Sequence, residues 1–205
     1  MIVLDIEASG LDFEKCGIWQ IGAIDFESNE EFLEECKIDD EDLILETSDS
    51  KNVLEIIGKS EEELRDKNKQ TQKEMIEKFF EWVAKRKEDI FLCMNPQFDI
   101  GYIWVKARKY GLEVKFQFKA FDLHTISQLK YFEIHNDFLF EEGKSKMGLK
   151  RICDFCGVED RRDKHNALED CKLTGECFSR LVYGKNIFSE YSKFEIPGEL
   201  KNDNL

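Results

Sequence analysis

The sequence lacks a long apolar run, a secretory leader and an excess of positive charge, and each absence excludes a class of protein. No apolar stretch approaches the roughly 20 residues that cross a bilayer, so we expect no membrane-spanning segment. The first residues carry no basic region followed by an apolar core, so we expect no signal peptide. The chain also has no internal repeat. With 205 residues and 41% hydrophobic content, it is suited to one globular domain.

The cysteines and the net charge indicate the compartment of the protein and limit how it can bind nucleic acid. Seven cysteines, an odd number scattered along the chain, fit a reducing cytoplasm better than a disulfide framework. The net charge of -14 disfavours a long track for nucleic acid, because such a track needs many Lys and Arg contacts to phosphate. The charge is uneven, since residues 25–50 are strongly acidic and residues 144–164 are basic. This asymmetry either orients a polyanion toward one surface or is simply a solvated surface.

Hydrophobic patterning predicts an α/β or α+β domain with one sheet covered by helices. The expected strands are residues 2–8, 17–26, 31–38, 90–94 and 118–123. The expected helices are residues 52–57, 60–67, 71–87, 96–110, 125–135, 147–155 and 167–183. Ser60 and Glu63 form an expected capping box. The acidic stretch before residue 50 is an expected loop, and the tail after Gly184 is expected to be loosely held.

The first expected strand, residues 2–8, combines apolar residues with two acids. Alternation places Asp5 and Glu7 on the same face, about 7 Å apart, and the isoleucines on the other. Two like charges inside an apolar strand would repel each other and lose hydration. A Mg²⁺ or Mn²⁺ ion resolves both costs, because these ions prefer hard oxygen ligands. The alternative is an edge strand whose acids face water.

A further acid is expected at the start of the helix that follows residues 90–94. Asn95 is a candidate N-cap, and Pro96 suits the first helical position. Asp99 then lies in the first turn of this helix.

The last long helix is expected to carry another inward acid. Asn166 and Glu169 form an N-cap and N3 pair, so the helix begins at Ala167 and Asp170 lies one turn in, on the apolar face. A buried carboxylate is costly unless it finds a partner or a metal. His165 is expected in the loop just before the helix, where it suits acid–base chemistry.

Three segments together resemble the exonuclease motifs of the DEDDh 3′-5′ exonucleases, a superfamily that includes ribonuclease T, oligoribonuclease and the proofreading subunit of bacterial DNA polymerase III. They are DIEASGL from Asp5, NPQFD ending at Asp99, and HNALED from His165 to Asp170. One DxE pair is common, whereas three motifs in this order are specific. The resemblance implies a ribonuclease H-like α/β fold, with a mixed five-stranded sheet flanked by helices. It makes residues 1–183 a single exonuclease domain and residues 184–205 a C-terminal tail.

The resemblance also implies the chemistry. The chain would be a metal-dependent 3′-5′ exonuclease that acts on single-stranded DNA or RNA, or on short oligonucleotides, and releases nucleoside 5′-monophosphates. Two Mg²⁺ or Mn²⁺ ions would be held by Asp5, Glu7, Asp99 and Asp170, with His165 as general base for the attacking water. The residue types agree with this, because two metals about 4 Å apart stabilise the attacking and leaving oxygens of a phosphodiester displacement.

Substrate contacts are implied near two of the motifs, at Ser9, Gly10, Leu11, Asn95 and Phe98. Leu11 would lie against a base of the 3′-terminal nucleotide, and the alternative for Leu11 is an ordinary core residue.

Some positions depart from the family pattern. Met94 stands where relatives often carry His, Pro96 where a small residue is common, and Ala8 with Ser9 where threonine-containing pairs are frequent. No carboxylate is lost, but the choice between RNA and DNA is left open.

Two further features need weighing. Cys153 and Cys156 form a single CxxC, which is poor support for zinc without a second pair, and their helical spacing favours core packing. Asp122 lies at the end of the strand expected at residues 118–123. It is a candidate for the acidic cluster, but a structural role is preferred.

Two other functions stay open. A ribonuclease H-like module could bind nucleic acid or protein without cleavage, although such a module does not need four clustered carboxylates. An accessory module could dock a partner through its acidic surface, and the partner would then choose the substrate. The expected partners are therefore a nucleic-acid 3′ end and either another protein or a second copy of this chain, with no membrane.

Overall fold

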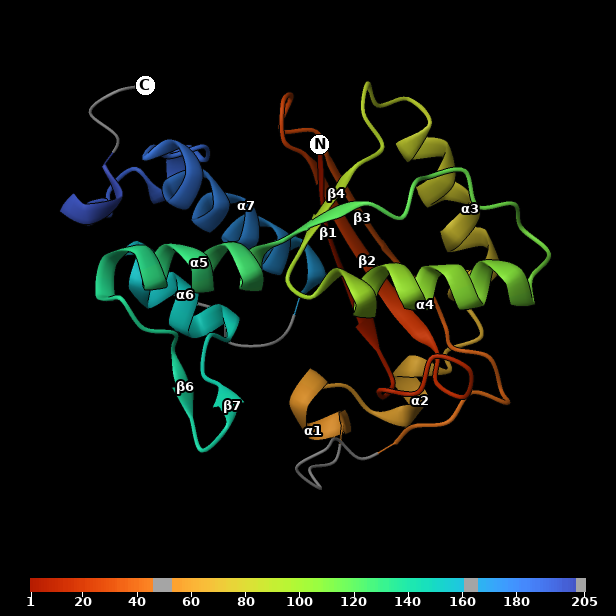
Figure 1. Cartoon of the computed structure of the whole chain (residues 1–205). Helices are drawn as coiled ribbons and strands as arrows, with labels where there is room; N and C mark the ends of the chain where they lie inside the picture. The colour runs from red at the N-terminus through yellow and green to blue at the C-terminus, as the bar shows by residue number, and fades with distance from the viewer. Residues whose placement is uncertain (46–52, 161–165, 202–205) are drawn as a thin grey trace.

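The computed structural model describes residues 1–45, 53–160 and 166–201, and its centre is a five-stranded sheet in the order β3-β2-β1-β4-β5 (Figure 1). The strands are β1 Ile2–Ala8, β2 Ile18–Asp25, β3 Glu31–Glu35, β4 Phe91–Cys93 and β5 Ala120–Asp122. β2 is antiparallel to β1 and to β3, whereas β4 is parallel to β1 and to β5. This mixed sheet, flanked by helices, confirms the predicted fold.

Helices cover both faces of the sheet (Figure 1). One face carries α3 Gln72–Val83 and α4 Pro96–Lys109, and the other carries α5 Leu123–His135, α6 Leu149–Cys156 and α7 Ala167–Tyr183. The side chains of β1 alternate between two hydrophobic cores, one on each face of the sheet. Its isoleucines pack with α3 and α4, whereas Val3 packs with α7. The acids of β1 share the Val3 face. The short helices α1 Val53–Ile57 and α2 Glu61–Leu64 pack in a third, small cluster with Trp19.

Helix starts follow the predicted caps with one exception. Ser60 and Glu63 form the expected capping box, and the Asn166 side chain caps α7. Asn95 stands at the predicted N-cap position of α4, but its side chain does not cap the helix. Asn95 has a left-handed backbone, with φ 65°, and its side chain makes no capping hydrogen bond. The chain turns sharply from the buried strand β4 into α4, and Asn is one of the few residues that tolerate this conformation. Pro96 occupies the first turn as expected.

The segment after α7 departs from the prediction of a loosely held tail. Its described part contains two short 3₁₀ helices, Ser189–Tyr191 and Gly198–Leu200. Glu176 of α7 accepts a hydrogen bond from the backbone N–H of Phe188 at 3.2 Å. Arg180 donates to the backbone carbonyl of Tyr191 at 3.0 Å. The prediction is wrong for residues 185–201, because they satisfy a buried ion pair between Glu176 and Arg180.

One element and several element ends were missed, among them the end of α3, which is Val83 rather than residue 87. A small hairpin, β6 Phe140–Glu141 with β7 Lys144–Ser145, is too short and too exposed to give an alternating pattern. β3 ends at Glu35 rather than at residue 38. Among the described helices, none has the length and apolarity that a membrane span requires.

Candidate active site

Three acids, Asp5, Glu7 and Asp170, lie together where β1 faces the start of α7. Each offers one carboxylate oxygen, and the three oxygens lie within 4.8 Å of one another. Glu7 is 8% exposed and Asp170 is 6% exposed, whereas Asp5 is half-buried. The expected alternation along β1 and the inward face of α7 therefore bring these acids to one place.

The close approach of α7 to the sheet depends on Gly22 of β2. Gly22 pairs with Asp5 across the antiparallel ladder. A Cβ at Gly22 would lie 2.4 Å from the backbone carbonyl carbon of Ala167, so only glycine leaves room for the helix. The backbone N–H of Ala167 also donates to Oε1 of Gln20 at 2.8 Å. The first turn of α7 is thus fixed beside Asp5, which places Asp170.

Asp99 approaches the same place from α4 and is 2% exposed. Its Oδ1 accepts a hydrogen bond from the backbone N–H of Ile6 at 3.0 Å. β4 pairs only with the first two residues of β1, so the Ile6 N–H, further along that edge, is left for the helix. Burial raises the pKa of Asp99 well above its usual range, and the charges of Glu7 and Asp170 raise the pKa further, although the Ile6 hydrogen bond opposes this.

This donor set fits a divalent cation. Oδ2 of Asp99 is buried and has no hydrogen-bond partner among the described residues. Asp99 is not in the group that shares the 4.8 Å spacing, but it interacts electrostatically with Glu7 and Asp170. Clustered, desolvated carboxylates are costly unless a cation offsets their charge. A set made only of oxygens is the kind that Mg²⁺ or Mn²⁺ prefers.

A family model described as exonuclease, of the RNase T type, matches residues 2–178, which include all four acids. The chain belongs to this exonuclease family. The resemblance to the DEDDh 3′-5′ exonucleases is confirmed by this match and by the folds of solved nucleases. A search of the curated proteins found no match.

Several solved nucleases share the fold of this exonuclease domain. Cell-death related nuclease 4 has a TM-score of 0.66 and 16% identity, over 90% of this chain and 64% of that chain. E. coli exonuclease I in complex with a dT13 oligonucleotide has a TM-score of 0.68 and 16% identity, over 87% of this chain and 40% of that chain. The nuclease domain of 3′hExo, a DEDDh family member bound to rAMP, has a TM-score of 0.63 and 12% identity, over 95% of this chain and 94% of that chain. This chain therefore spans less than two thirds of the first two proteins.

The turn after β1 separates the predicted substrate contacts of the exonuclease domain into two kinds. Ser9 is fully buried, and its hydroxyl donates to the Leu43 carbonyl at 2.7 Å and accepts from the Gly17 N–H at 2.9 Å. The Ser9 hydroxyl therefore holds the turn together, and the contact of Ser9 with the 3′-terminal nucleotide stays a prediction. Gly10 is also buried. Leu11 is 55% exposed, so the core alternative for Leu11 is wrong.

Asn95 and Phe98 are both half-buried near Asp99. The Phe98 ring packs edge-on against Tyr102 with centroids 5.0 Å apart. The backbone N–H of Asn95 donates to Oδ1 of Asp122 at 3.3 Å. Asp122 also caps α5, so the preferred structural role of Asp122 is confirmed. The substrate roles of Asn95 and Phe98 stay predictions.

His165 lies outside the described residues, as do residues 161–164 of the basic stretch. The next residue, Asn166, accepts hydrogen bonds from the backbone N–H groups of Leu168 and Glu169 at 3.1 and 3.2 Å. α7 therefore begins at Ala167, as the sequence predicted.

The cysteines are all free and buried. Cys153 and Cys156 lie in the core that joins α6 to α7, and the sulfur of Cys177 is 3.8 Å from that of Cys153. Core packing of the CxxC segment is confirmed.

Sequence reasoning missed Gly22 and Gln20, which fix the start of α7 on β2. A glycine inside an apolar strand indicates close approach of another backbone, so Gly22 gave a usable signal. Gln20 gave none, because a buried glutamine has no periodic signature of its own.

Proposed function

We propose that this chain is a metal-dependent 3′-5′ exonuclease that hydrolyses single-stranded DNA or RNA, or short oligonucleotides, and releases nucleoside 5′-monophosphates. The observation that carries the proposal is the meeting of Asp5, Glu7 and Asp170, with oxygens within 4.8 Å, beside the buried Asp99. Membership of the exonuclease family supports the reaction class. The solved relatives, one of them in complex with dT13, support a single strand as substrate.

The four carboxylates would hold two Mg²⁺ or Mn²⁺ ions. Bound divalent ions would supply charge stabilisation for the attacking and leaving oxygens of the phosphodiester. Four acids suit this task, because two dications and one phosphate together come near neutrality with them. Oδ2 of Asp99, which lacks a donor among the described residues, is the acceptor that most needs a cation.

We assign the general base to His165, on its position five residues before Asp170 in the sequence. An imidazole nitrogen would take the proton of the attacking water, for which an unperturbed pKa of about 6.5 is suited. The other histidines serve other contacts. Nε2 of His124 lies 2.7 Å from the Ser145 hydroxyl, and the His135 ring packs on Tyr131.

The substrate would be gripped at its 3′ end. The exposed Leu11 side chain would pack against the terminal base, since it stands on the turn that directly follows the β1 acids. The net charge of -14 argues against a long phosphate track. Few phosphate contacts lead to a shallow dependence of affinity on salt concentration.

A reducing compartment such as the cytoplasm is part of the proposal. Its support is the set of seven cysteines, all free and buried.

The test is degradation of 5′-labelled single strands, DNA and RNA in parallel, with Mg²⁺, Mn²⁺ or EDTA. The expected result is a ladder that shortens from the 3′ end and disappears with EDTA and in the Asp5→Ala, Glu7→Ala double variant. The matched control removes two exposed acids elsewhere, Glu113→Ala with Glu199→Ala, and should cleave like the wild type.

Histidine variants divide the roles further. We expect His165→Ala to lose most of its activity and His124→Ala to keep it. If no strand is cleaved under any condition, yet a strand or a protein partner binds without metal, the enzyme proposal fails and the binding or accessory module takes its place.

A further inference from the structure

One face of α4 carries three buried polar side chains, Asp99, Tyr102 and Lys106. They recur at helical spacing and are 2%, 0% and 0% exposed. Asp99 accepts the Ile6 N–H of β1, as described above. The Tyr102 hydroxyl donates to the Gly10 carbonyl at 2.6 Å. Nζ of Lys106 lies 3.0 Å from Oδ1 of Asp42. One rigid helix therefore holds the strand, the turn after it, and a third segment.

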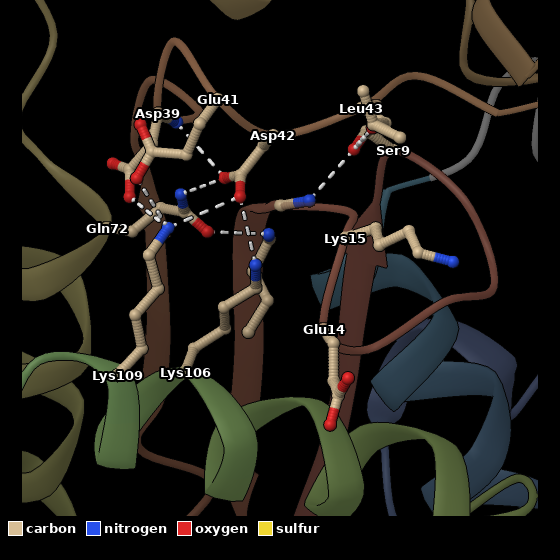
Figure 2. Close-up of polar contacts among 12 residues, drawn as sticks. Ser9, Glu14, Lys15, Asp39, Glu41, Asp42, Leu43, Gln72, Lys106 and Lys109 are labelled. Atoms are coloured by element: carbon tan, nitrogen blue, oxygen red, sulfur yellow. Dashed lines mark hydrogen bonds and ion pairs between the residues drawn. The ribbon is translucent and has the colours of Figure 1, made fainter.

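That third segment is anchored through Asp42, which is 2% exposed (Figure 2). Oδ1 of Asp42 faces the ammonium groups of Lys106 and, at 3.4 Å, Lys109, both on α4. Oδ2 accepts a hydrogen bond from the Gln72 side chain. Gln72 in turn accepts the backbone N–H of Ile18 at 2.8 Å. A buried carboxylate with both oxygens paired in this way is held rigidly, since loss of any partner is costly.

Residues 39–45, here called the strap, lie directly on the turn that follows the β1 acids. The Leu43 carbonyl accepts the Ser9 hydroxyl at 2.7 Å (Figure 2). The Leu45 N–H donates to the Ser9 carbonyl at 3.0 Å. A Cβ on Gly10 would lie 3.1 Å from Cβ of Leu45, so the strap and the turn are in close contact. Leu11, the residue after Gly10, is exposed.

We propose that Tyr102 and Lys106 are positioning residues that set where the Ser9–Leu11 turn stands relative to Asp99, and thereby control binding of the 3′-terminal nucleotide. The inference rests on the proposed function. Neither side chain is exposed, so each acts through the turn and not by contact with substrate. Tyr102 holds the turn directly, and Lys106 holds it through Asp42 and the strap. The same helix carries Asp99, so α4 fixes the positions of both the acid and the turn.

The test compares Tyr102→Phe, which removes only the hydroxyl, and Lys106→Met with a control that breaks a different buried ion pair. The control is Arg180→Met, because Arg180 and Glu176 are both fully buried and pair at 2.8 Å, toward the end of α7. The readouts are kcat and KM on 5′-labelled dT10 or U10, whichever the wild type cleaves, with Mn²⁺, and the midpoint of thermal unfolding.

A hydrogen bond of ordinary strength corresponds to about a five- to tenfold change in an equilibrium. We therefore expect Tyr102→Phe to raise KM by about that factor with kcat within twofold of the wild type. Lys106→Met should raise KM at least as much, and Lys106→Arg should restore part of the loss. Arg180→Met should lower the unfolding midpoint and leave KM within twofold.

Unchanged KM in folded Tyr102→Phe overturns the inference and leaves these residues a structural role only. A fall in kcat at constant KM also overturns the inference, since Tyr102 and Lys106 would then act on the carboxylates. If Lys106→Met fails to fold, Tyr102→Phe decides alone. Failure of the proposed function is a separate result, in which the wild type, like the Asp5→Ala, Glu7→Ala double variant, cleaves no strand, and it removes this inference with it.

Discussion

The backbone N–H of Ile6 and Oδ1 of Asp99 form a hydrogen bond of 3.0 Å between residues 93 positions apart. This bond ties the central strand to α4 at the point where β4 no longer pairs with β1. It leaves Oδ2 of Asp99 as a buried acceptor without a partner among the described residues. One oxygen of Asp99 therefore serves the fold, and the other is left for a cation.

Substitution of Asp99 should separate these two tasks. Asp99→Asn keeps an acceptor for the Ile6 N–H and removes a buried charge, so we expect a metal-free protein at least as stable as the wild type, with activity reduced by a factor of about 100 or more. Asp99→Ala leaves the Ile6 N–H unsatisfied and should lower the free energy of unfolding by about 1–3 kcal/mol. Urea unfolding and the strand-cleavage assay measure the two effects. Equal stability of the two variants would contradict the structural half of this account.

Gly22→Ala should damage the site from β2, the strand that pairs with β1 beside Asp5. The added Cβ would lie 2.4 Å from the Ala167 backbone, which cannot yield as a flexible side chain can. We expect a loss of about 1–3 kcal/mol in the free energy of unfolding and weaker Mn²⁺ binding, because Asp170 moves with the start of α7. Gly148→Ala is the control, since a Cβ there meets nothing within 4 Å and φ is -77°. Wild-type Mn²⁺ affinity in Gly22→Ala would argue against the placement of α7.

Acid should weaken the anchoring of the strap. Burial alone raises the pKa of Asp39, but hydrogen bonds from Lys109, at 2.7 Å, and from Tyr110 lower it below its usual value overall. A carboxyl with a lowered folded pKa adds stability above its unfolded pKa, near 3.9, and this stability is lost as the pH falls through the folded pKa. Asp39→Asn should therefore be less stable than the wild type at neutral pH and lose less on acidification below about pH 4.

Thermal unfolding across this pH range measures the difference. The exposed neighbour variant Asp40→Asn should keep the wild-type profile. Parallel profiles for Asp39→Asn and the wild type would show that the contacts of Asp39 contribute nothing in solution.

Removal of the tail after Gly184 should destabilise the domain. Glu176 would lose the N–H of Phe188, and Arg180 would lose the carbonyl of Tyr191, which leaves buried charges partly unsatisfied. We expect the free energy of unfolding to fall by roughly 3–5 kcal/mol, a typical cost for breaking a buried charged network. A chain that ends at Lys201 is the control. Equal denaturant midpoints for the two truncated chains would contradict the observed packing.

The acids of β1 could be predicted because strand alternation fixes which side chains share a face, and the start of α7 because Asn166 has the side chain to cap it. The nearness of Asp170 to Asp5 is different. It depends on the space above Gly22, which is a property of two segments packed together and not of either sequence alone.

Other features escaped prediction for similar reasons. Asn95 looked like a side-chain cap, but the tight entry into α4 required a left-handed residue instead. The tail looked polar and terminal, and its order comes from Glu176 and Arg180, which helical patterning marks only as charged residues on α7. The burial of Ser9 likewise depends on its contacts with the strap, and the strap is part of a segment that reads as an acidic loop.

The most direct test of the central claim is anomalous diffraction from crystals soaked with Mn²⁺ and a nucleoside 5′-monophosphate. The account predicts two Mn²⁺ peaks among Asp5, Glu7, Asp99 and Asp170, with carboxylate oxygens at about 2.0–2.6 Å, as for hard cations. Absence of a peak at these acids while they are well ordered, or peaks only at other residues, would contradict it.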